Sequence, residues 1–125
     1  MTALVLQVAD DLFAAVERGD MTALGAMWSD DVTVWRLGGG GPRDKNRALK
    51  VIDWFIGATQ VRRYELVDRE VFDGGFVQQH VLHATTNSGT TVSLRVCMVV
   101  KVAPTGLITR IEEYLDPAEL APLST

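Results

Sequence analysis

Three turns divide the second half of the chain into four extended segments, and this division constrains the fold more than any other feature. The turns contain Gly74 and Gly75, Gly89, and Gly106, and each also contains Asp, Asn, Ser or Pro. Short turns of these residue types join neighbouring antiparallel strands. The segments between them are β-branched or alternate polar with apolar side chains, which predicts a β-meander over residues 61–72, 76–86, 90–102 and 107–115.

The chain before this meander begins with two predicted helices. Residues 3–16 place apolar side chains at helical spacing, with charged residues on the other side. Gly19 is suited to the left-handed conformation that closes a helix, and Asp20 is suited to cap a second, short helix through residues 24–28. The pattern therefore predicts a helical hairpin packed on one face.

A strand, a glycine loop and a third helix follow. After a turn at residues 29–31, the β-branched run 32–37 predicts a strand. The loop over residues 38–42 contains four glycines, but the Gly-Lys-Ser/Thr sequence of a phosphate-binding loop does not follow, so a mobile rim over a pocket is the favoured interpretation. Asp44 is expected to cap the third helix, and Gly57 to end it.

This order of elements predicts an α+β fold in one domain over residues 1–125. Helices come first and a meander follows, so we expect a curved, antiparallel or mixed sheet wrapped around the N-terminal helices. The chain is 47% hydrophobic and 22% charged, as is ordinary for a globular domain. Its 125 residues allow one hydrophobic core.

Charge and cysteine content exclude several classes of protein. The formal net charge is −4 and the pI is about 5.0, which argues against nucleic-acid binding. Cys97 is the single cysteine, so no intrachain disulfide forms, and a reducing cytoplasm is the expected location. We expect no signal peptide, because Asp10 and Asp11 interrupt the N-terminal apolar residues, and no membrane partner.

Two stretches carry a resemblance to a known superfamily. They are Trp28-Ser29-Asp30-Asp31-Val32, entering the first strand, and Gly106-Leu107-Ile108-Thr109-Arg110-Ile111-Glu112-Glu113-Tyr114-Leu115-Asp116, forming the last. With the order of elements, they make the chain resemble the nuclear transport factor 2-like superfamily, which includes SnoaL-like polyketide cyclases, ketosteroid isomerases and limonene epoxide hydrolases. The resemblance covers nearly the whole chain and implies a cone-shaped, cystatin-like α+β barrel.

The resemblance to ketosteroid isomerases does not extend to their catalytic groups. The position of their catalytic base corresponds to Arg36, that of the tyrosine donor to Leu12, and that of the protonated aspartate to Met98. Steroid isomerisation by their mechanism is therefore not expected.

In limonene epoxide hydrolases, polar residues on two strands activate a water molecule. The corresponding positions here are Gln78, His80 and Glu113, with Val34 and Arg36 at the accompanying positions of the first strand. Every identity differs, but polar groups are retained at four of these five positions. Water activation by the chain remains a hypothesis.

A reactive pair is the central prediction about chemistry. Strand alternation places Gln78 and His80 on one face, which the resemblance identifies as the inner one, and Glu113 lies between apolar neighbours on the last strand. A buried carboxylate needs a partner, so we hypothesise that His80 pairs with Glu113 and titrates near neutral pH as an acid–base catalyst. Gln78 and Arg36 would hold substrate oxygens. Leu12, Val34, Met98 and Trp54 complete the predicted substrate-binding set.

Structural interpretations of the same residues stay open. A buried His–Glu pair is also a structural tie, Arg36 is also suited to pair with Glu113 or Asp53, and Gln78 is also suited to the core as a hydrogen-bonded amide.

Three further expectations concern metals, thiol chemistry and assembly. His80 and His83 lie on opposite faces of a strand, so no metal site is predicted, and no cofactor. Cys97 is expected to be an inert thiol. The outer sheet face carries Trp35, Val81 and Val99, which predicts a two-fold homodimer.

The sequence therefore predicts a small-molecule-binding protein. The favoured function is cofactor-independent acid–base catalysis, of the isomerase, cyclase or epoxide hydrolase type, on an apolar carbonyl- or epoxide-bearing substrate. The alternative is a non-catalytic ligand-binding or dimerisation module of the same fold.

Overall fold

The structure, a computed structural model, describes residues 2–124. Three helices come from the first half of the chain, and four of the five strands from the second. A short 3₁₀ helix, η1, ends the described chain. The elements are α1 (Thr2–Arg18), α2 (Met21–Met27), β1 (Trp28–Arg36), α3 (Lys45–Ala58), β2 (Thr59–Phe72), β3 (Gly75–Thr86), β4 (Thr91–Val102), β5 (Ile108–Tyr114) and η1 (Pro117–Ser124).

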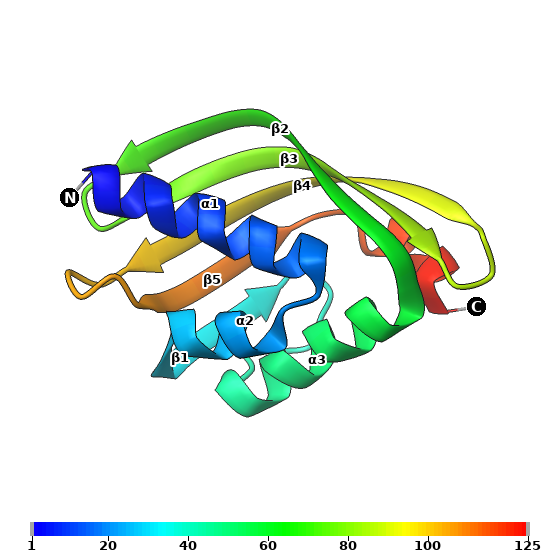
Figure 1. Cartoon of the computed structure of the whole chain (residues 1–125), viewed down its shortest axis with the longest axis horizontal. Coiled ribbons are helices and arrows are strands. Elements are labelled where there is room, and N and C mark those ends of the chain that lie inside the picture. The colour runs from blue at the N-terminus through cyan, green and yellow to red at the C-terminus, as the bar shows by residue number, and fades with distance from the viewer. Residues whose placement is uncertain (1, 125) are drawn as a thin grey trace.

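The strands form one curved sheet in the order β1-β5-β4-β3-β2, with the helices on its concave side (Figure 1). β1 runs parallel to β5, and the other neighbours are antiparallel. The sheet is mixed and open, with β1 and β2 at its edges. This arrangement confirms the predicted α+β fold with a curved sheet around N-terminal helices.

The predicted helix caps form as expected. A carboxylate oxygen of Asp20 accepts a hydrogen bond from the Ala23 amide at 3.0 Å, and that of Asp44 accepts one from the Arg47 amide at 2.9 Å. These bonds satisfy amides that the first turn of a helix leaves unpaired. Gly19 has a φ of 70°, which lets the chain reverse between α1 and α2.

Several element boundaries differ from the sequence prediction, and two of these differences have a local structural cause. α3 continues past Gly57 to Ala58, because the Thr59 hydroxyl donates to the carbonyl oxygen of Phe55 at 2.8 Å and so satisfies the end of the helix. β1 begins at Trp28, where a turn was expected to follow a helix. Trp28 pairs with Ile108 of β5, and the register shifts before the next pair, so the residues between them bulge instead of turning.

The hydrophobic core fills the space between α1 and the concave face of the sheet. Alternate residues of β3 and β4 are buried, which is the period expected of strands covered on one face. The largest fully buried side chains include Trp28, Phe76, Leu24 and Ile108. Within residues 2–124, no helix is both long and apolar enough to cross a membrane.

Candidate ligand-binding and acid–base site

A cavity of about 240 Å³ lies inside the curve of the sheet. α1 and α3 form one side, the inner faces of the strands form the other, and two leucines of η1 complete the wall. The lining is mainly apolar and includes the predicted positions Leu12, Val34, Met98 and Trp54. Trp54 is 52% exposed although it lines the cavity, so its indole ring lies where the cavity meets the surface.

One row of directly paired residues crosses the whole sheet on this inner face. Arg36 of β1 pairs with Glu113 of β5, Glu113 with Met98 of β4, Met98 with Gln78 of β3, and Gln78 with Arg69 of β2. Directly paired residues present their side chains on the same face. The polar residues of this row therefore fall into two groups, one on each side of Met98.

The first group consists of Arg36 and Glu113, and both line the cavity. Among residues 2–124, no hydrogen bond or ion pair within 4.0 Å involves the guanidinium of Arg36 or the carboxyl group of Glu113. Nε of Arg36 is buried without a partner. Burial raises the pKa of Glu113 above its ordinary value, and the charge of Arg36 opposes that rise only in part.

Arg43 brings a second guanidinium to the cavity. Its backbone forms two hydrogen bonds with Val34, of 2.8 and 3.0 Å, so the glycine loop folds back beside β1. Nη2 of Arg43 donates to the carbonyl oxygen of Gly39 at 3.0 Å. No local sequence pattern predicts this position, because only the conformation of the loop places Arg43 next to the strand.

Tyr64 of β2 is a further cavity residue that the sequence analysis did not identify. Its ring makes edge-to-face contacts with Phe13 and His80, with centroid distances of 4.9 Å in both cases. Its hydroxyl group has no hydrogen-bond partner among the described residues. Burial, with the nearby carboxylates of Glu113 and Glu17, raises the pKa of Tyr64, so the hydroxyl remains a donor. The alternation of charged and apolar residues along 61–72 was the sequence pattern that indicated this position.

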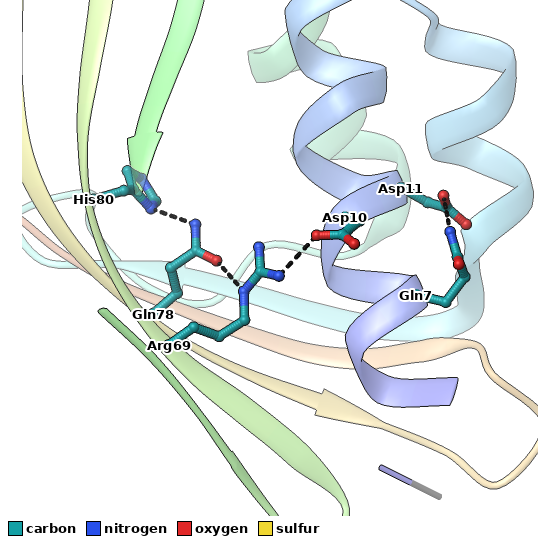
Figure 2. A network of polar contacts seen from close by, with 6 residues as sticks. All are labelled: Gln7, Asp10, Asp11, Arg69, Gln78 and His80. Atoms are coloured by element: carbon teal, nitrogen blue, oxygen red, sulfur yellow. Dashed lines mark hydrogen bonds and ion pairs between the residues drawn. The ribbon is translucent and has the colours of Figure 1, made fainter. Parts of the chain in front are cut away.

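The second group joins His80 to α1 through Gln78 and Arg69 (Figure 2). Nδ1 of His80 lies 3.0 Å from Nε2 of Gln78, and Oε1 of Gln78 accepts from Nε of Arg69 at 2.7 Å. Nη1 of Arg69 then contacts Asp10 of α1 at 2.8 Å. His80 and Gln78 are each 1% exposed, and neither is among the residues that line the cavity.

The predicted pairing of His80 with Glu113 is therefore wrong. No hydrogen bond or ion pair within the described chain joins these two side chains, because Gln78 occupies the position beside Nδ1 of His80. The expected titration near neutral pH is also wrong. Burial, together with the positive charge of Arg69, lowers the pKa of His80 from 6.5 to about 4. Gln78 is a hydrogen-bonded core amide, which was the open alternative for this residue.

His83 lies on the outer face, as its place in the strand predicts. Its ring nitrogens contact Ser93 at 2.9 Å and Glu65 at 2.7 Å. Trp35 also lies on that face, where its ring contacts Tyr114 edge-to-face at a centroid distance of 5.2 Å.

The family of the chain is decided by a comparison with protein-family models. The SnoaL-like domain model matches residues 9–111, which is most of the chain. The chain belongs to the SnoaL-like family. No curated protein matches its sequence significantly.

Solved structures share the fold of this SnoaL-like protein at low sequence identity. PrhC from Penicillium brasilianum is 13% identical, with a TM-score of 0.85 over 97% of this chain and 85% of its own. An epoxide hydrolase of M. tuberculosis, similar to limonene epoxide hydrolases, is 16% identical, with a TM-score of 0.79 over 97% and 89% of the two chains. Rv0760c from Mycobacterium tuberculosis, solved in complex with estradiol-17β-hemisuccinate, is 20% identical, with a TM-score of 0.78 over 93% and 96%.

Proposed function

We propose that this SnoaL-like protein binds a small apolar molecule that carries a carbonyl group and moves a proton on it. Glu113 is the proton acceptor and donor, and Arg36 and Tyr64 hold the carbonyl oxygen. This assignment keeps Arg36 in the role that the sequence predicted for it. It gives the acid–base role of His80 to Glu113 and the oxygen-binding role of Gln78 to Tyr64.

The observation that supports the proposal is the pair of unsatisfied, oppositely charged groups in an apolar cavity. Glu113 and Arg36 are direct neighbours across β1 and β5, yet more than 4.0 Å separates their charged atoms. A carboxyl group whose pKa is raised by burial is a stronger base once it loses its proton. A guanidinium without a protein partner is available for an oxygen that gains negative charge.

The proposed step is enolisation. The carboxylate of Glu113 takes a proton from the carbon next to the carbonyl group, and the electrons of the broken C–H bond move to the carbonyl oxygen. Arg36 and the Tyr64 hydroxyl hydrogen-bond to that oxygen as it becomes an enolate. Glu113 then returns its proton to the same or another carbon, so the reaction needs no other reactant. An isomerase or a cyclase would use this same first step.

The relatives of known structure support small-molecule use of the fold. Rv0760c holds a steroid hemisuccinate, and another relative is an epoxide hydrolase. We extend from them only the class of ligand, a small and largely apolar molecule.

Deuterium exchange tests the proposal directly. In deuterium oxide, the protein should catalyse exchange at the α-carbon of compact apolar ketones such as phenylacetone and tetralone, followed by NMR. Glu113→Gln should abolish the catalysed exchange, and Arg36→Met should slow it by about 100-fold, the typical effect of losing one oxyanion donor. The matched control is Glu112→Gln, since Glu112 is the neighbour of Glu113 in the same strand, lies on the opposite face of the sheet and pairs with Arg110. Equal rates in wild type and Glu113→Gln would refute the role of Glu113.

A non-catalytic binding module is the second candidate. The positions that correspond to the ketosteroid isomerase donors hold Leu12 and Met98, and both are apolar lining residues. Saturable binding of the ketones without any exchange above the buffer rate would favour this function.

We also infer that the outer sheet face forms a homodimer. Trp35 and Tyr114 make their edge-to-face contact there, and Tyr114 is 41% exposed in the single chain. Apolar residues on an uncovered sheet face favour association of two copies.

A further inference from the structure

The cavity has an excess of positive charge, although the whole chain is acidic. The chain has 12 basic and 16 acidic residues. Among the described residues that line the cavity, the charged ones are Arg36, Arg43 and Glu113. Two cations and one acid thus face a mainly apolar space, and the acid is the group whose pKa is raised by burial.

We propose that the natural ligand is a compact apolar acid whose anionic oxygen pair binds to Arg36 and Arg43. The oxygen pair is a carboxylate or the enolate of a β-dicarbonyl compound. This inference rests on the small-molecule function proposed above and deepens it by naming the class of ligand.

The two arginines are arranged on the same side of the site. Arg43 is paired through its backbone with Val34, and Arg36 lies two residues further along the same strand, so the three side chains share the inner face. The Gly39 amide donates to the carbonyl oxygen of Arg36 at 2.9 Å, while the Gly39 carbonyl accepts from Arg43. One glycine therefore holds both arginine segments in place.

A ligand anion supplies the negative charge and the hydrogen-bond acceptors that Arg36 lacks within residues 2–124 of the protein. A guanidinium in an apolar cavity is costly unless a partner of opposite charge accepts its hydrogen bonds. Arg36 has no such partner in the part of the chain that the structure describes, and Glu113 lies beyond 4.0 Å. The planar fork of arginine matches two oxygens of one anion, which a neutral ketone does not provide.

The volume of the cavity limits the rest of the ligand. About 240 Å³ is below the range of roughly 300–1,000 Å³ that is common for sites of drug-sized ligands. The walls around the arginines are apolar, with Val34, Met98 and Ile111 on the sheet and Leu12 on α1. A body of one or two rings fits these limits better than the four fused rings of a steroid.

Matched acid and amide probes test the inference. Phenylacetate, cyclohexylacetate and naphthylacetate are each compared with the corresponding amide by calorimetry at pH 7 and low salt. The acids should bind at least about tenfold more tightly than the amides, the factor expected of hydrogen bonds to a charged group. An acidic β-dicarbonyl ring compound, compared with its monoketone, distinguishes the enolate from the carboxylate.

Variants then assign the preference to the two arginines. Arg36→Met and Arg43→Met should each reduce the acid-to-amide ratio to near one, whereas Arg36→Lys should keep part of it. Arg63→Met is the matched control, because Arg63 is exposed on the opposite face of β2 and should leave the ratio unchanged.

The wild-type comparison needs no variant and is decisive if a variant fails to fold. Amides that bind as tightly as their acids would overturn the inference, and so would binding of none of the probes. Ketone exchange by the wild-type protein is measured separately. If exchange occurs while acids show no preference, this inference fails and the proposed function stands.

Discussion

The side-chain amide of Gln78 fixes the protonation of His80. Because Oε1 of Gln78 accepts from Arg69, its Nε2 faces His80 at 3.0 Å and acts only as a donor. Nδ1 of His80 is therefore the acceptor, and the proton of the neutral ring lies on Nε2. A protonated ring would place two donors against each other, which adds to the cost of charging a buried imidazole.

This relationship predicts that acid destabilises the protein through His80. The folded-state pKa is about 4, against 6.5 for the ordinary group, so the unfolded chain binds the proton first as pH falls. The stability that neutral His80 contributes is complete above pH 6.5 and is lost progressively between 6.5 and about 4. The total is on the order of 3 kcal/mol, measurable by urea unfolding across this range.

His80→Phe should flatten that part of the pH profile, while His83→Gln, on the outer face, should leave it in place. Identical profiles for the wild type and His80→Phe between pH 6.5 and 4 would contradict the assignment.

Arg69 is predicted to contribute more to stability than its ion pair with Asp10 implies. Its side chain is 14% exposed and bonds to a buried amide, whereas Asp10 is 66% exposed. Arg69→Met should cost about 1–3 kcal/mol, because it leaves Oε1 of Gln78 buried without a donor. Asp10→Ala should cost less than about 1 kcal/mol. Equal losses in chemical denaturation would show that the surface ion pair dominates.

Glu113 is predicted to reduce stability at neutral pH. Its raised pKa means that the folded state keeps the proton longer than the unfolded state, so stability falls as pH rises from the ordinary value of 4.5 to the folded value. Glu113→Gln removes this penalty and should raise the melting temperature at pH 7 but not at pH 4. Glu112→Gln serves as the control, and a lower melting temperature for Glu113→Gln at pH 7 would contradict the prediction.

Filling the cavity should abolish ligand binding with little loss of fold. Val34→Phe adds a ring beside Arg36 on the inner face. Because the ring enters the cavity, the loss in free energy of unfolding should stay below the about 1–3 kcal/mol that overpacking a filled core costs. The shift in melting temperature that a ligand produces should disappear. Val61→Phe, at an exposed position, should retain the shift.

A charge at Trp35 should prevent the predicted dimer. Trp35→Glu places a carboxylate beside Tyr114 on the outer face, where association would bury it. Sedimentation at micromolar concentration should show a dimer for the wild type and a monomer for this variant. A wild-type monomer would contradict the predicted interface.

Local sequence patterns were sufficient for most of the fold. Glycine turns set the hairpins, and Asp20 and Asp44 capped the helices that they were expected to cap. Strand alternation, together with the inner face that the resemblance implied, placed Arg36 and Glu113 toward the cavity. These features depend on neighbouring residues and on a period of two along a strand. Gln78 and His80 were also placed correctly on the buried face.

The sequence by itself determined which side chains of β3 and β5 share a face, and the tertiary structure decided which of them meet and which side chains of β2 point inward. The pairing of β2 with β3 shifts at Val67, and that shift sets Arg69 against Gln78. The register of β1, β5 and β4 separates Glu113 from His80 and sets it beside Arg36. Register, bulges and burial join residues distant in the sequence, and they fix both the hydrogen-bond partners and the pKa values. Alternation along one strand contains no information about its neighbours.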